Sequence, residues 1–193
     1  MNYGCWTTIP RPNGKVRNDT RKFSSSEEST HEQIQGKNYY YCYFDNFGIV
    51  RKEFVPPGQT VNHAFYKDVL ERLWKRVQRA RTDIADEWVL HHNNAPAHTE
   101  LSIREFLAKK TIPVLPHPPY SPDLAPCDFC LFPKLKWKLK GHHFGTMENI
   151  QKIVTDELHT LTENDFWYCY DQWKKSWNHC TNSQGSHYEG DNL

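Results

Sequence analysis

Two short segments of the chain carry the residue types that could do chemistry. The first, His91 to His98, follows the apolar run Trp88-Val89-Leu90, which is typical of a buried strand. The second, Ser121 to Asp128, follows a proline-rich approach and opens a helix. The 34 residues between Asn93 and Asp128 leave room for one helix and one strand, so both side chains can return to the same edge of a sheet. Two acidic groups there would make a divalent metal site, but one of the two is an amide.

Several stretches resemble the C-terminal part of the catalytic domain of mariner-family transposases, including the transposase half of the SETMAR fusion proteins. The matching stretches are 44–50, 53–62, 91–99 and, most specifically, His-Pro-Pro-Tyr-Ser-Pro-Asp-Leu-Ala-Pro-Cys-Asp-Phe at 117–129. The block from Tyr43 to Asp191 covers roughly three quarters of the chain, far more than a short-motif match. The resemblance implies an RNase H-like fold and metal-dependent DNA strand cleavage and transfer, which lead to DNA transposition and integration.

The resemblance also implies roles for single residues. Asn93 stands where the family has its second catalytic Asp, and Asp128 stands where it has the third. In this fold three carboxylates hold two divalent ions, Mg²⁺ or Mn²⁺, against a phosphodiester. The first Asp of the family lies on a central strand in an Asp-Glu-Thr/Lys-Trp context, and no such motif precedes Tyr39. Asp45 aligns with the following hairpin, so we assign no first carboxylate.

An amide changes the chemistry of such a site. Asn93 offers a cation one neutral carbonyl oxygen and an NH₂ group that repels it, where Asp would offer an anionic oxygen. We therefore predict that Asp128 and Asn93 form a degenerate catalytic and metal-binding pair. We expect it to bind Mg²⁺ poorly and not to cleave DNA.

Bulk properties indicate one domain without a membrane span. The 193 residues are 37% hydrophobic and 14% aromatic, and the net charge is only +1, so a nucleic-acid surface must be local. The apolar runs are too short to cross a bilayer, and the polar N-terminus lacks a secretory apolar core. The resemblance then implies a nuclear location. The six scattered cysteines favour reduced thiols over disulfides, and Cys127-x-x-Cys130 favours two buried thiols over half of a zinc site.

The most concentrated basic patch lies between residues 134 and 140. Its alternating pattern alone is typical of a strand, but the resemblance places it on the helix that Asp128 opens. Phosphate contact and a solvated helix face remain two open interpretations of its lysines. The predicted nucleic-acid-binding residues are Lys134, Lys136, Lys138, Lys140 and His98.

We expect any DNA binding to be weak and non-specific. The paired helix-turn-helix that recognises transposon ends is not found in this sequence, so specific recognition is not expected. The family's homodimer is compatible with the chain, although its usual N-terminal elements are not found either.

Hydrophobic periodicity and capping residues predict the remaining elements. We expect a hairpin of strands 39–45 and 49–55, a helix after Asn62, a strand at 87–92, a helix after Thr99, a short edge strand at 112–115, and helices after Thr146 and Thr162. This order predicts an α/β fold, an RNase H-like mixed sheet flanked by helices and incomplete at its N-terminus.

The predicted domain organisation has three parts. Residues 1–37 form a polar, poorly ordered remnant in which Cys5-Trp6 is the trace of a strand, residues 38–185 form a partial catalytic domain, and residues 186–193 form a polar tail. If the central strand is missing, its neighbours lose their ladder partner, at about 1–3 kcal/mol for each unpaired buried backbone group.

One helix carries an aromatic stripe, which consists of Phe166, Tyr170, Trp173 and Trp177. We predict that it packs in the core. Three functional hypotheses follow from the sequence. The chain is an inactive transposase fragment, a residual DNA-binding module, or a non-catalytic protein-interaction domain that exposes this aromatic stripe.

Overall fold

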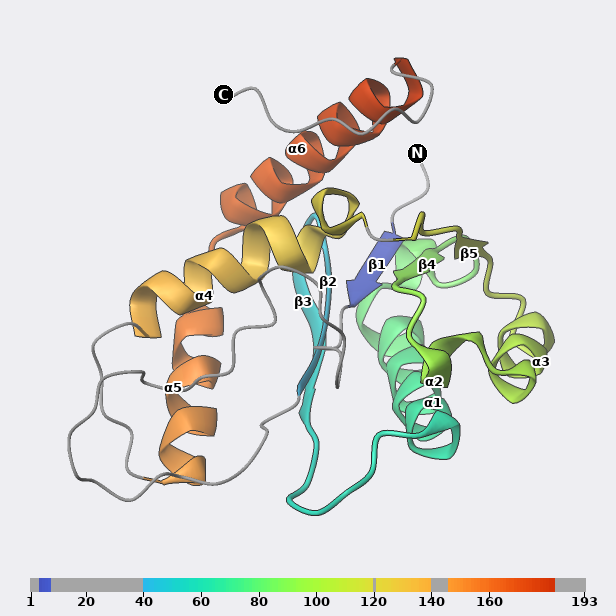
Figure 1. The fold of residues 1–193 in the computed structure, drawn as a ribbon, viewed down its shortest axis with the longest axis horizontal. Helices are drawn as coiled ribbons and strands as arrows, with labels where there is room; N and C mark the ends of the chain where they lie inside the picture. The colour runs from blue at the N-terminus through green and yellow to red at the C-terminus, as the bar shows by residue number, and fades with distance from the viewer. Residues whose placement is uncertain (1–3, 8–39, 120, 140–145, 183–193) are drawn as a thin grey trace.

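A mixed sheet of five strands forms the centre of the protein (Figure 1). The computed structural model describes residues 4–7, 40–119, 121–139 and 146–182, with the backbone alone at 4–7, 138 and 139. The strand order is β3-β2-β1-β4-β5. β1 pairs antiparallel with β2 and parallel with β4, and β4 pairs parallel with β5. The strands are β1 (Gly4–Thr7), β2 (Tyr40–Asp45), β3 (Gly48–Phe54), β4 (Val89–His92) and β5 (Val114–Leu115).

Helices cover both faces of the sheet. In Figure 1, α1 (His63–Ala80), α2 (Pro96–Thr99) and α3 (Leu101–Lys109) lie on one side, and α4 (Phe132–Leu139), α5 (Met147–Thr160) and α6 (Glu163–Asn182) lie on the other. Three short helical turns complete the described elements: η1 (Thr82–Ile84), η2 (Pro122–Leu124) and the π-helical turn η3 (Cys127–Leu131).

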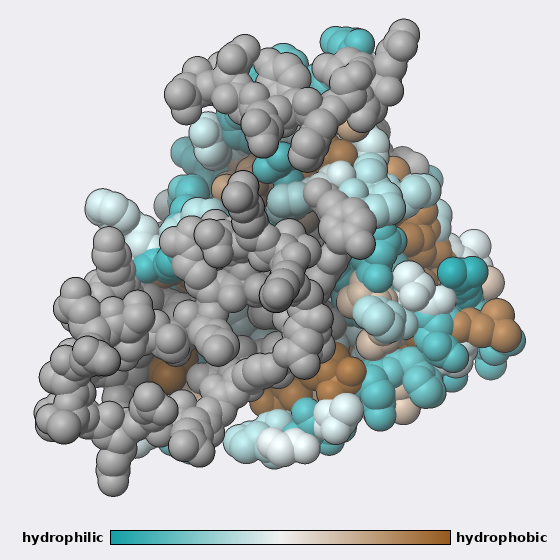
Figure 2. Space-filling view, viewed as in Figure 1, coloured by the Kyte–Doolittle hydropathy of each residue, from teal (hydrophilic) through white to brown (hydrophobic). Residues whose placement is uncertain are grey.

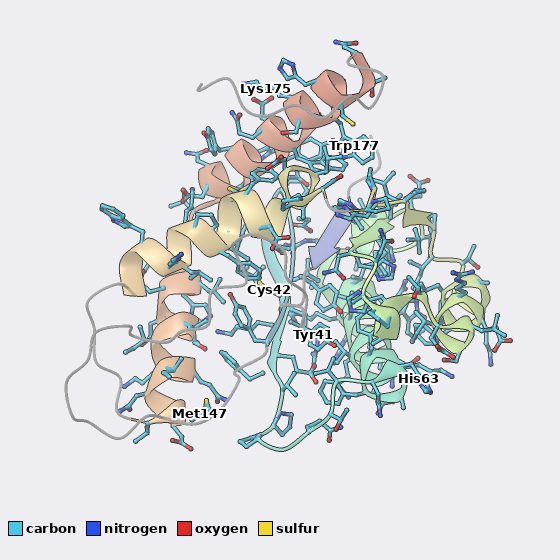
Figure 3. The ribbon with its side chains drawn as sticks, in the orientation of Figure 1. Tyr41, Cys42, His63, Met147, Lys175 and Trp177 are labelled. Atoms are coloured by element: carbon cyan, nitrogen blue, oxygen red, sulfur yellow. A yellow bond between two sulfur atoms is a disulfide. The ribbon has the colours of Figure 1, made fainter. Side chains whose placement is uncertain are left out.

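Strand β2 separates two hydrophobic cores. Tyr41 and Tyr43 pack in the core under α1 and α3, whereas Cys42 and Phe44 pack in the core under α4–α6. Figure 3 labels Tyr41 and Cys42, one from each core. Successive side chains of a strand point to opposite faces, so a strand buried on both faces has no polar side. All six residues of β2 are accordingly buried.

The β2–β3 turn is held by one buried carboxylate. Asp45 Oδ1 accepts the backbone N–H groups of Phe47 and Gly48 at 2.9 and 3.0 Å, and the Asp45 carboxylate also pairs with Arg81 at the end of α1. Gly48 has a φ of +138°, which a residue with a side chain rarely adopts. Asp45 therefore stabilises the turn of the hairpin with which the family resemblance aligned it.

Most predicted elements are confirmed with small shifts of their ends. Asn62 caps α1 through its side chain, Thr146 caps α5, and the basic segment is helical in α4. The helix predicted after Thr99 instead begins after Glu100, because Thr99 ends the short helix α2. β5 is the edge strand, as Pro113 directly before it predicts.

The central strand of the sheet is present. β1 occupies the central position, so β2 and β4 keep the ladder partner whose loss would have followed from a missing central strand. The strand trace predicted at Cys5-Trp6 is therefore confirmed as part of β1. The rest of the predicted polar segment, and the predicted tail at 186–193, lie outside the described residues.

The surface is of mixed polarity. On the face shown in Figure 2, hydrophobic residues form small separate patches among hydrophilic ones. None of the helices in the described part of the chain is long and apolar enough to cross a membrane.

Candidate functional site

Asn93 directly follows the last residue of β4 and starts the turn into α2. Its Oδ1 accepts the backbone N–H of Ala95 at 3.1 Å, so the amide oxygen already closes a local turn. Its backbone oxygen lies 3.1 Å from Nδ1 of His98. A carbonyl oxygen can only accept, so His98 Nδ1–H donates this bond.

A buried stack of three rings supports this turn. Tyr66 on α1 contacts both His92 and His98, with ring centroids 5.9 and 3.9 Å away. The two histidine rings are also stacked on each other, 5.1 Å apart and 4° from parallel. The Tyr66 hydroxyl is 2.7 Å from His92 Nδ1. His98 Nε2 is buried and has no hydrogen-bond partner among the described residues.

Burial keeps this cluster uncharged. Removal from water lowers the pKa of His92 to about 4 and that of His91 to about 3, with the neighbouring His117 as the second cause. Burial also lowers the pKa of His98 well below its usual value and raises that of Tyr66. At neutral pH the bond between Tyr66 and His92 therefore joins two uncharged side chains.

His91 on β4 contacts residues that connect this strand with the segment that carries Asp128. His91 Nε2 lies 3.1 Å from His117 Nδ1, and the His91 ring is 5.7 Å from the ring of Trp173 on α6. Trp173 Nε1–H donates to the backbone oxygen of Leu124 in η2 at 3.1 Å. Asp128 lies four residues further along the chain. Trp173 is thus the side chain that connects the end of β4 with the η2–η3 segment.

Asp128 lies in the first turn of the helical segment that continues into α4. Its backbone N–H donates to the oxygen of Ala125 at 2.8 Å, and its side chain is half-buried. The preceding Cys127 is buried, with its Sγ 3.9 Å from the backbone oxygen of Cys42 on β2. The start of η3 is therefore packed directly on the sheet.

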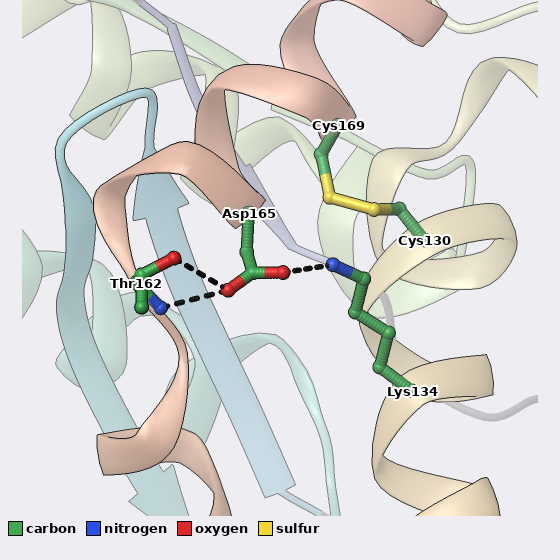
Figure 4. Close-up of a disulfide and its surroundings, with 5 residues drawn as sticks. All are labelled: Cys130, Lys134, Thr162, Asp165 and Cys169. Carbon is green, nitrogen blue, oxygen red and sulfur yellow. Dashed lines mark hydrogen bonds and ion pairs between the residues drawn. A yellow bond between two sulfur atoms is a disulfide. The ribbon is translucent and has the colours of Figure 1, made fainter.

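A disulfide ties the same segment to α6, contrary to the prediction of reduced thiols. Cys130 in η3 and Cys169 in α6 are bonded, with 5.7 Å between their Cα atoms (Figure 4). The two residues are 39 positions apart, and only the tertiary fold brings them together. Cys130 is thus not half of a zinc site, while Cys42 and Cys180 are free thiols.

The central strand supplies no carboxylate. β1 reads Gly-Cys-Trp-Thr, its Trp6 is in register with His91 of β4, and the first acidic residue of the chain is Asp19. No group of three His, Cys, Asp or Glu side chains among the described residues is placed to hold a metal ion. Among the described residues, the two predicted positions, Asn93 and Asp128, offer one anionic group between them, fewer than a two-metal site for Mg²⁺ uses.

The predicted nucleic-acid-binding residues lie in different environments. Lys134 is ion-paired with Asp165, whose pKa it lowers to about 2 by hydrogen bonding, and Asp165 also accepts two bonds from Thr162 (Figure 4). Lys136 is half-buried on α4, and the side chains of Lys138 and Lys140 lie outside the described residues. Phosphate contact by these lysines stays a prediction.

His98 requires a correction. Only 2% of its surface is exposed, because it is enclosed by Tyr66 and His92, so it is not available to a phosphate. The ring stack that encloses it is formed by α1, β4 and α2 together, which the motif alone did not indicate.

The aromatic stripe of α6 faces the core. Phe166 and Tyr170 are buried, and Trp173 and Trp177 are half-buried and pack edge to face. This confirms the packing prediction and removes the hypothesis that the stripe is an exposed protein-binding surface. The aromatic side chains that are exposed lie elsewhere and include Trp137, with 79% of its surface exposed.

The strand order, the parallel pairing of β1 with β4 and the helical segment that begins near Asp128 define an RNase H-like catalytic domain of the transposase class. The chain belongs to the mariner transposase family, within the part that forms the catalytic domain. No protein-family model matches the chain.

Two relatives in sequence support this assignment. Mariner Mos1 transposase of Drosophila mauritiana is 31% identical over 158 residues, which cover 80% of this chain and 46% of Mos1. The human histone-lysine N-methyltransferase SETMAR is 25% identical over 144 residues, which cover 74% of this chain and 21% of SETMAR. The chain thus spans less than half the length of either relative.

Solved structures agree with this assignment. The Mos1 catalytic domain with raltegravir and Mn superposes with a TM-score of 0.74 at 30% identity, covering 80% of this chain and 78% of that one. The Mos1 paired-end complex with the left transposon end gives a TM-score of 0.78 at 26% identity, covering 97% of this chain and 56% of that one.

Proposed function

We propose that this chain is a transposase-derived domain that associates with DNA without cleaving it. The observation that carries the proposal is the central strand, whose four residues include no carboxylate. In a two-metal site the ions activate the attacking oxygen and stabilise the leaving oxygen, and anionic ligands must hold them. Asn93 and Asp128 provide one negative charge between them.

The local hydrogen bonds of Asn93 support the same proposal. Its amide oxygen is occupied by Ala95 N–H in the turn that opens α2. The bond fixes the orientation of the amide group, and the oxygen that this group could offer a metal ion is neutral. Replacing the amide by a carboxylate would restore one charge at β4 and leave β1 without any.

Cleavage of supercoiled plasmid tests the proposal directly. Purified protein is expected to produce no nicked or linear DNA above background with either Mg²⁺ or Mn²⁺. The variant Asn93→Asp is expected to remain inactive, because the central strand still lacks its carboxylate. Metal-dependent nicking by the native chain that disappears in Asp128→Ala would contradict the proposal.

DNA association is the second part of the proposal, and charge distribution supports it. No acidic residue occurs between Asp128 and Glu148, while the segment contains four lysines. Such a segment contacts phosphates irrespective of base sequence, and the resulting affinity falls steeply with salt. We propose weak, non-specific binding to DNA, a nuclear location and, by analogy with the family, a homodimer. A gel shift without any retarded DNA even near ~50 mM salt would contradict the binding.

A further inference from the structure

Trp137 is the most exposed large hydrophobic residue in the described part of the chain. With 79% of its surface exposed, it contributes almost nothing to the core, although its helix is well anchored. Leu131 and Leu135 bury the inner side of the segment, at 1% and 2% exposure. The apolar side of α4 is therefore used by the fold, and Trp137 lies on the outer side.

The charge around Trp137 indicates what could cover it. Its two neighbours in sequence are Lys136 and Lys138, and Lys134 lies one helical turn before it on α4. Protein interfaces are depleted in lysine, particularly at their centres. A membrane would require the apolar side of the helix, which is buried against the protein. A polyanion with flat aromatic groups fits both the charge and the ring.

We propose that Trp137 is a stacking platform for an unpaired base of a single DNA strand, whose phosphates the adjacent lysines contact. This inference rests on the proposed DNA association and adds to it a preference for unpaired strands. In a duplex both faces of each base are covered by neighbouring bases, so the Trp137 ring gains a stacking partner only where a base is unstacked. The lysines do not distinguish the two forms of DNA in this way, because both carry phosphates.

Another exposed tryptophan provides a matched control. Trp167 on α6 is 40% exposed, but its Nε1–H donates to Glu163 at 3.3 Å and its ring contacts Phe47. A carboxylate beside the ring repels phosphate. Trp167 should therefore not contribute to DNA binding, although it is the same residue type on the same protein.

The test is a binding titration with a labelled oligodeoxythymidylate of about 12 nucleotides, compared with a duplex of the same length. Trp137→Ala is expected to weaken binding of the single strand by roughly 5- to 100-fold, and that of the duplex by less than about 2-fold. Trp137→Phe should retain most of the affinity, and Trp167→Ala should match the native protein. Lys136→Ala should weaken both DNA forms and reduce the dependence of affinity on salt.

The outcomes distinguish a failure of the stacking site from a failure of the proposed DNA association. If Trp137→Ala binds the single strand like the native protein, or weakens both DNA forms equally, the stacking site is wrong while lysine-dependent DNA association stands. If the native protein binds neither form, both are wrong. If Trp137→Ala leaves DNA binding unchanged but converts a dimer to a monomer in size-exclusion chromatography with light scattering, the surface is a protein contact instead. Thermal melting of each variant verifies that the fold is intact.

Discussion

Two hydrogen bonds hold the histidines at the end of β4. The carbonyl of Asn93 can only accept, so His98 carries a proton on Nδ1, and His92 Nδ1 shares a hydrogen bond with the Tyr66 hydroxyl. Burial lowers the pKa of both histidines and keeps them neutral. The buried ring stack is therefore a structural support of the turn at Asn93, and it is stable only while its members remain uncharged.

Stability should consequently depend on pH in a definite direction. The folded-state pKa values of His91 and His92, about 3 and about 4, lie below the ordinary value of 6.5. As the pH falls below that ordinary value, the unfolded chain binds protons that the folded chain does not. The free energy of unfolding should then fall by about 1.4 kcal/mol per pH unit for each such histidine.

Urea denaturation at several pH values between about 7 and 5 measures this slope. The stabilisation by neutral histidines is fully present above their unfolded pKa and is lost toward acid. His91→Asn should reduce the slope, because one of the depressed groups is removed. A free energy of unfolding that stays constant over this range would show that the histidines are not held neutral.

At the scale of elements, α6 positions the segment that carries Asp128, a role that its own sequence did not indicate. It holds the Asp128 segment at three points: the Cys130–Cys169 disulfide, the Trp173 bond to Leu124, and the ion pair between Lys134 and Asp165. Each contact joins α6 to a different part of η2, η3 and α4. The position of Asp128 relative to the sheet thus depends on a helix that begins 35 residues later.

Loss of the disulfide should loosen this attachment. Closing a loop between residues 39 positions apart is expected to contribute about 2–4 kcal/mol to the free energy of unfolding. Cys169→Ser, or reduction of the native protein, should lower the midpoint of denaturation accordingly. Cys180→Ser is the control, since Cys180 is a free thiol on the same helix. Equal stability of oxidised and reduced protein would contradict the expected contribution.

At the scale of the whole molecule, β1 joins the two halves of the sheet. On one side it pairs with the β2–β3 hairpin and on the other with β4 and β5. These four strands belong to chain segments on either side of α1, so β1 is the element through which the sheet is continuous. The continuity of the sheet therefore depends on a strand of only four residues.

A proline substitution in β1 tests whether the fold depends on this strand. Trp6→Pro removes a backbone donor from the centre of the sheet and is expected to prevent stable folding, with loss of cooperative thermal unfolding. Val114→Pro places a proline in the edge strand instead. It should lower the free energy of unfolding much less, because β5 pairs on one side only. Equal effects of the two substitutions, measured by circular dichroism during heating, would contradict the central role of β1.

The sequence alone determined the features that depend on near neighbours. The apolar period of α1, the caps at Asn62 and Thr146 and the amide at Asn93 act within a few residues, so their effects could be predicted without coordinates. The family resemblance placed Asp128 at the start of its helix for the same reason, since a continuous motif carries it.

Only the tertiary structure decided the features that depend on distant partners. It placed Gly4–Thr7 in the centre of the sheet, bonded Cys130 to Cys169, buried His98 and paired Lys134 with Asp165. None of these has a local signal, because each arises from segments that packing of the two cores brings together. The charge and type of a residue, read from the sequence, indicate which interactions its side chain could form. The burial of that side chain and its neighbours in the fold decide which of these interactions it does form.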